Sequence, residues 1–105
     1  MEKPNLTYIN KISGGDITFE TKIISILKAE FPNEKAIYYQ KVKQNNFEQI
    51  AEIVHKLKHK ISILDLQKAY NDAVKYESNL LNQNMKGKTE FESTLETITD
   101  YLGTL

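Results

Sequence analysis

Hydrophobic residues recur along this chain at steps of three and four, the spacing that places them on one side of an α-helix. The clearest stripe consists of Phe47, Ile50, Val54, Leu57, Ile61 and Leu64. Asn46, just before it, and Gln49 together resemble a capping box, so a helix is expected to begin there. The stripe defines one narrow apolar face, which predicts that Leu57 is buried.

Two helices are predicted before this stripe. The first covers residues 5–13 and ends at Gly14, which suits a left-handed helix cap. The second begins after Asp16 as N-cap and extends to about Val42. Pro32 lies inside it and removes a backbone donor, but the apolar spacing resumes afterwards. We therefore expect a kink at Pro32.

Two more helices are predicted after the stripe. Asp65 is placed to cap a helix that extends to about Asn84. Thr89 and Glu92 form a second capping box, which predicts a final helix that ends near Gly103.

These five helices predict an all-α fold in a single domain over residues 1–105. Short loops between long helices favour antiparallel neighbours, so we expect an antiparallel four-helix bundle with a short extra N-terminal helix. The predicted core includes Phe19, Ile23, Leu27, Ile50, Val54, Leu57, Ile61, Tyr70, Phe91, Leu95 and Ile98.

Composition narrows the classes of function. The basic and acidic residues number 14 each, so the formal net charge is zero and no global field attracts nucleic acid or an anionic membrane. The absence of Cys excludes a disulfide framework, a thiolate metal cluster and a Cys nucleophile. No stretch approaches the roughly 20 apolar residues of a membrane span, and no apolar run follows the first charges. We expect a monomeric cytoplasmic protein that requires no cofactor.

Both histidines lie on the helix of the clearest stripe. On a helical wheel His55 points about 135° from the mean direction of the stripe, and His59 points almost directly away from it. Lys56, Lys58 and Lys60 occupy the same two turns, and no acidic residue occurs between Glu52 and Asp65.

This pattern indicates a local anion site on the exposed face. Lys58, three residues after His55, can bring its ammonium to a group carried on the imidazole, and a phosphoryl group suits that position. The plain alternative is a pair of solvated histidines on a lysine-rich surface.

Metal binding is a second alternative, because His55 and His59 at i, i+4 share a helical face. Three neighbouring ammonium groups and the absence of the Glu of an H-E-x-x-H motif argue against it, so we expect no metal. No G-x-S-x-G, Gly-rich phosphate loop or Walker motif occurs, and we expect no enzyme activity of its own.

The segment His55-Lys56-Leu57-Lys58, followed by Leu64 and Leu66, resembles the H-x-L-K core of the histidine phosphotransfer (HPt) family of two-component phosphorelays. Gly14-Gly15-Asp16 with Phe19 and Phe31-Pro32 is similar to the entry segment of that family. Together with the two closing helices, the resemblance covers residues 5–102.

The resemblance implies that His55 accepts a phosphoryl group from a receiver-domain aspartyl phosphate and passes it to a response regulator. It implies that Lys58 stabilises the phosphoryl group and that Mg²⁺ is left to the receiver. The implied partners are receiver domains and a hybrid histidine kinase, with Lys56, His59 and Ser62 on the receiver-docking face. The alternative is a non-phosphorylated helical adaptor that docks receiver or kinase domains.

The chain departs from the family pattern at two positions. His59 stands where the family usually has Gly directly after the motif Lys, so it either adds a donor near the phosphoryl group or obstructs the receiver. Asp65 stands at a second family Gly, where we expect it to serve as the N-cap described above.

Overall fold

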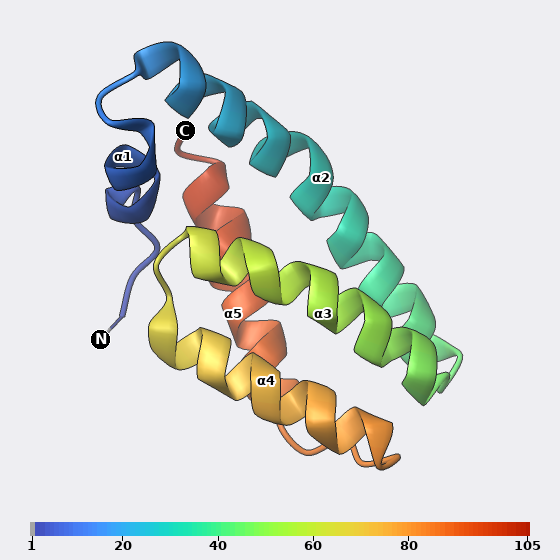
Figure 1. Ribbon diagram of the computed structural model, residues 1–105. Helices are drawn as coiled ribbons and strands as arrows, with labels where there is room; N and C mark the ends of the chain where they lie inside the picture. Colours follow the sequence, from blue (N-terminus) through green and yellow to red (C-terminus); the bar gives the residue numbers. More distant parts are fainter. Residues whose placement is uncertain (1) are drawn as a thin grey trace.

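The computed structural model describes residues 2–105 and contains five helices: α1 (Thr7–Ser13), α2 (Ile17–Lys43), α3 (Phe47–Ile63), α4 (Gln67–Leu81) and α5 (Lys88–Leu102) (Figure 1). No strand occurs among these residues, so the prediction of an all-α fold is confirmed. The chain reverses direction in each loop that joins the four long helices (Figure 1). None of the helices in residues 2–105 combines the length and the apolar character needed to cross a membrane.

The starts of α2 and α3 are capped by the residues that the sequence predicts. The Asp16 carboxylate accepts a hydrogen bond from the Phe19 backbone N–H at 3.1 Å. The Asn46 side-chain oxygen accepts one from the Gln49 backbone N–H at 3.1 Å. Each bond satisfies an N–H group that a helix N-terminus leaves without an intrahelical partner.

α2 is a single helix of 27 residues that passes through Pro32. It is about 40 Å long at 1.5 Å per residue, close to the 43 Å length of the whole molecule. Leu27 and Phe31, which precede the proline, are both buried. Apolar packing therefore holds the helix where the proline removes a backbone hydrogen bond.

Three helices end with a residue other than glycine in the left-handed conformation. These residues are Asn45 after α2, Asp65 after α3 and Gln83 after α4, with φ of 52°, 63° and 58°. After α3, the N–H groups of Asp65 and Leu66 donate to carbonyls of the last α3 turn, which is a Schellman motif. The prediction that Asp65 caps the fourth helix is therefore wrong, because Asp65 closes α3 instead and no local side chain caps α4.

A distant residue caps α4. The Glu2 carboxylate accepts hydrogen bonds from the backbone N–H groups of Lys68, at 2.8 Å, and Ala69, at 3.1 Å. An anionic group is favourable here because the free N–H groups and the helix dipole make this end of a helix positive. In Figure 1 the segment before α1 runs toward the start of α4, and the Asn5 N–H donates to the Leu64 carbonyl along its way.

α5 begins at Lys88, with Gly87 as its N-cap and no side-chain cap. The predicted capping box of Thr89 and Glu92 is therefore wrong, because the helix starts before Thr89. Gly87 has φ of 101°, and a Cβ at this position would lie 3.2 Å from the Tyr76 Cβ. Both the backbone conformation and the close approach to α4 require glycine at this corner.

One cluster of buried side chains includes residues from all five helices. α3 packs against α2 and α4, α5 packs against α4 and α2, and α1 packs against α2. Ile23 and Tyr70 of the predicted core are partly buried. The predicted core residues that are buried are Leu27, Ile50, Val54, Leu57, Ile61, Phe91, Leu95 and Ile98.

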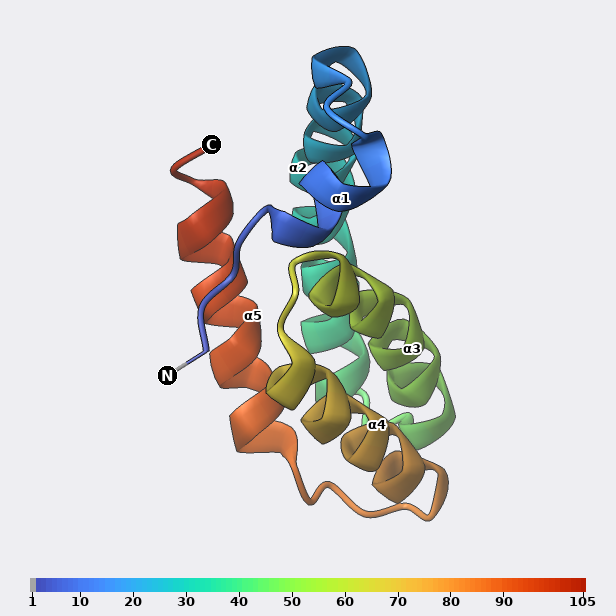
Figure 2. The same cartoon turned by 60° about the vertical axis from the view of Figure 1, so that its left-hand side comes forward.

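Phe19 is 42% exposed, so its prediction as a core residue is wrong. Near the end of α3, Lys60 forms ion pairs with Glu30 and Glu34 in the middle of α2. The first turns of α2, which carry Phe19, therefore extend past the end of α3. Figure 2 shows this part of α2 beside α1, away from the other helices.

Candidate functional site

Both histidines lie on the solvent side of α3. The His55 side chain is 54% exposed, whereas its neighbours Val54 and Leu57 are completely buried. His59 is also exposed, and its ring meets the His55 ring edge to face, with centroids 4.9 Å apart. The predicted orientation of α3 is therefore confirmed, and both imidazoles are accessible from solvent.

A carboxylate from α4 binds both His55 and Lys58. Glu77 Oε2 lies 3.1 Å from His55 Nδ1, and Glu77 Oε1 accepts a hydrogen bond from Lys58 Nζ at 2.8 Å. Glu77 was absent from the predicted site because it follows His55 by 22 positions and shares no local motif with it. One signal was available, since Glu77 interrupts the apolar stripe between Ala73 and Leu80, where a charged residue needs a partner.

The contact with Glu77 selects one tautomer of His55. An ionised carboxylate can only accept hydrogen bonds, so neutral His55 carries its proton on Nδ1. The lone pair is then on Nε2. A carboxylate that holds the other ring nitrogen also fixes the orientation of an imidazole. Glu77 therefore prepares Nε2 to act as a nucleophile or as a ligand.

Lys58 is less exposed than a free surface lysine. Its side chain is 12% exposed, and its ammonium lies 5.9 Å from the centre of the Tyr70 ring. Its aliphatic stem is thus largely covered while its charge reaches Glu77. Replacement of Lys58 by Ala would therefore remove packing as well as charge.

The other two lysines near the histidines, Lys60 and Lys56, differ in burial and in ion pairing. The Lys60 side chain is 11% exposed and forms ion pairs with Glu30 and Glu34, each at 3.0 Å. Burial alone lowers the pKa of Lys60, but hydrogen bonds to the two carboxylates outweigh this effect and the pKa is raised. Lys56 forms no ion pair within residues 2–105 and stays exposed.

A groove of about 490 Å³ adjoins His55 between α3 and α4. Its apolar lining includes Leu81, which is 64% exposed. The lining residues are Glu48, Ala51, Glu52, His55, Lys56, Glu77 and Leu81. Three carboxylates and one ammonium border this groove, so the surroundings of His55 are less basic than the sequence indicates.

The structure brings the predicted binding residues only partly together. Lys56 borders the groove beside His55, and His59 contacts the His55 ring. Ser62 is exposed near the end of α3 and lines a different groove, together with Tyr8 of α1 and residues at the start of α4.

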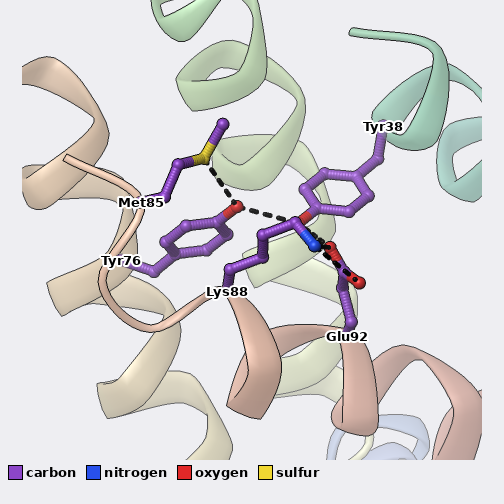
Figure 3. A network of polar contacts seen from close by, with 5 residues as sticks. All are labelled: Tyr38, Tyr76, Met85, Lys88 and Glu92. Atoms are coloured by element: carbon purple, nitrogen blue, oxygen red, sulfur yellow. Dashed lines mark hydrogen bonds and ion pairs between the residues drawn. The ribbon is translucent and has the colours of Figure 1, made fainter. Parts of the chain in front are cut away.

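A polar network that is buried at Tyr38 and Tyr76 and reaches the surface at Lys88 ties α4 to α2 and α5 (Figure 3). The Tyr76 and Tyr38 hydroxyl groups are 2.8 Å apart, Tyr38 donates to Glu92 at 2.9 Å, and Lys88 pairs with Glu92 at 3.2 Å. Burial raises the pKa of both tyrosines, and for Tyr38 the bond to Tyr76 raises it further. Because Tyr76 directly precedes Glu77, this network fixes the rotation of α4 that points Glu77 toward α3.

No three His, Asp or Glu side chains within residues 2–105 are grouped so that they could hold a metal ion. Comparison of the chain with protein-family models, with curated proteins and with solved structures finds no match.

Proposed function

We propose that this protein is a phosphorelay intermediate in which His55 accepts a phosphoryl group from a receiver-domain aspartyl phosphate and passes it to another receiver. One observation carries the proposal. The exposed His55 ring is held at Nδ1 by Glu77, which leaves the Nε2 lone pair free, and Lys58 lies beside the same carboxylate.

The transfer step needs only groups that the two proteins supply. The Nε2 lone pair of His55 attacks phosphorus, and the P–O bond to the aspartyl carboxylate breaks, with its electron pair returning to the carboxylate. The Nδ1 proton stays on the ring, which becomes cationic, and Glu77 neutralises it. The reverse step returns the phosphoryl group to a receiver Asp. Phosphoryl transfer requires mainly positioning and charge stabilisation, which this arrangement offers.

Lys58 stabilises the phosphoryl group in this proposal. Its ammonium is bound to Glu77 in the unphosphorylated chain, so it exchanges a carboxylate oxygen for a phosphoryl oxygen on phosphorylation. Lys58 lies close to His55, because both contact the same carboxylate.

We also propose that α2 to α5 form an antiparallel four-helix bundle of the HPt type, with α1 as its extra N-terminal helix. The contacts of α3 with α2 and α4, and of α5 with α4 and α2, support this arrangement. The partners would be response regulator receivers and a hybrid histidine kinase, and the site of action the cytoplasm.

Phosphorylation of the full chain tests the proposal. Wild-type protein, His55→Gln and His59→Gln are incubated with a receiver domain that carries a labelled aspartyl phosphate. We expect acid-labile, base-stable label on the wild type and on His59→Gln, and no label on His55→Gln, because only His55 has the orienting carboxylate. Peptide mass spectrometry locates the label, and circular dichroism checks that all three proteins fold.

Two outcomes would contradict the proposal. Label of wild-type strength on His55→Gln would assign the reaction to another residue. Stable binding of the receiver without any label on the wild-type chain would instead support a helical adaptor that docks receivers and is not phosphorylated.

A further inference from the structure

His59 is in contact with His55 but has no polar partner of its own within residues 2–105. The two ring centroids are 4.9 Å apart and the ring planes are at 89°. His59 is exposed and takes part in none of the side-chain hydrogen bonds or ion pairs that these residues form. Its ring N–H group is thus free to bind a group that arrives from solvent.

The three lysines on this face differ from His59 in their contacts or in their direction. Lys58 is bound to Glu77 in the unphosphorylated chain and binds a phosphoryl group only after it leaves that carboxylate, and Lys60 is bound to carboxylates of α2. Lys56 has no ion pair within residues 2–105 and borders the same groove as His55, but it follows His55 directly and therefore points about 100° away from it around the helix. His59 is the donor that lies one turn from His55, in ring contact with it, and without a partner.

We propose, as an inference that rests on the proposed function, that His59 binds the phosphoryl group that His55 accepts. It does so by donating a ring N–H to a phosphoryl oxygen. A phosphoryl group on Nε2 presents three oxygens around the edge of the His55 ring. An imidazole N–H donates to such an oxygen at an N···O distance of about 2.7–3.2 Å. The His59 ring is already in contact with the His55 ring, so rotation of the His59 side chain can bring its N–H within this distance. The donor would stabilise the negative charge that the phosphoryl oxygens carry during transfer.

An imidazole at position 59 has two opposing effects on a relay protein. It offers a donor to the phosphoryl group, and its bulk limits how closely a receiver approaches. A small phosphoryl donor separates these effects, because it needs no docking surface. Potassium phosphoramidate, which transfers its phosphoryl group to histidine, is a suitable probe.

The test compares the full wild-type chain with His59→Leu, which has similar bulk but no donor, and with His59→Gln, which retains an N–H donor. Label on His55 is followed over time by peptide mass spectrometry, which also distinguishes it from label on position 59. We expect His59→Leu to be labelled about tenfold more slowly than wild type, and His59→Gln to stay within about threefold of it. Nuclear magnetic resonance of the phosphorylated wild type should also show a His59 ring N–H signal protected from exchange, absent before phosphorylation.

Equal labelling rates for wild type and His59→Leu, with no protected His59 N–H, would overturn the role of His59 while leaving His55 as the acceptor. If His55 of the wild type takes no label from either phosphoramidate or a phosphorylated receiver, the proposed function itself fails. The two failures are therefore distinguishable in the same experiment.

Discussion

At the scale of single residues, Glu77 contacts both His55 and Lys58. Glu77→Gln keeps the shape of the side chain but removes the charge that holds the Nδ1 proton of His55 and the ammonium of Lys58. We expect phosphoryl acceptance by His55 to slow by about 10–100-fold, the range found when the hydrogen-bond partner of a metal-bound imidazole is removed. The rate of labelling by phosphoramidate measures this.

Lys58→Met provides the matched control, because Met keeps most of the covered stem and the His55–Glu77 contact while it removes the ammonium. Folding of both variants should be close to wild type by urea unfolding. An unchanged labelling rate in Glu77→Gln would show that the contact with His55 does not orient the nucleophile.

The parts of the site that lie close together in the sequence could be predicted. The exposure of His55 and its spacing from Lys58 follow from one helical stripe, because residues on one helix share a phase. Glu77 belongs to another helix, and its approach to His55 and Lys58 depends on how α3 and α4 pack. The ion pairs between Lys60 and α2 could not be predicted for the same reason, so the positive charge around His55 is lower than the sequence indicates.

At the scale of the helices, α4 depends on the Glu2 cap. Glu2→Gln removes the charge that faces the N-terminus of α4, and we expect it to destabilise the protein by about 0.5–2 kcal/mol, the range for loss of an N-cap. Urea unfolding measures the loss. Hydrogen exchange should accelerate first at the amides of Lys68 and Ala69, which Glu2 binds. Lys3→Gln, a neighbouring change outside the cap, serves as the control, and equal exchange in both variants would exclude the cap.

Helix boundaries were predictable where the capping group is a neighbour in the sequence. Asp16 and Asn46 each bind the N–H group three residues later, so a short pattern is sufficient to find them. Asp65 also looked like an N-cap, but the same residue type tolerates the left-handed conformation that ends a helix. Glu2 could not have been found, because its capping bond joins residues 66 positions apart.

At the scale of the whole molecule, the buried tyrosines predict a loss of stability at alkaline pH. Their pKa values are raised in the folded protein, so above about pH 10 the unfolded chain loses these protons first and the folded state is disfavoured as pH rises. The stabilisation is fully present below that pH. The pKa of Lys60 is raised too, so it contributes to the same decline.

Tyr38→Phe isolates the tyrosine contribution. At pH 7 it should cost about 1–3 kcal/mol, because it removes the bond to Glu92 and leaves the Tyr76 hydroxyl with only the Met85 sulfur as a partner. Between pH 9 and pH 11, its stability should fall less steeply than that of wild type. Urea unfolding at a series of pH values gives both quantities, and parallel curves would show that Tyr38 does not titrate differently in the two states.

The ion pairs around the histidines also determine how this protein meets a partner in solution. The chain has zero formal net charge, and Glu77 and the α2 carboxylates neutralise two of the three lysines near His55. Without a strong local field, diffusional encounter is not accelerated by long-range attraction, and association rates stay near the roughly 10⁵–10⁶ M⁻¹s⁻¹ of unsteered protein pairs. We therefore expect the rate at which a partner associates with this protein to depend little on ionic strength.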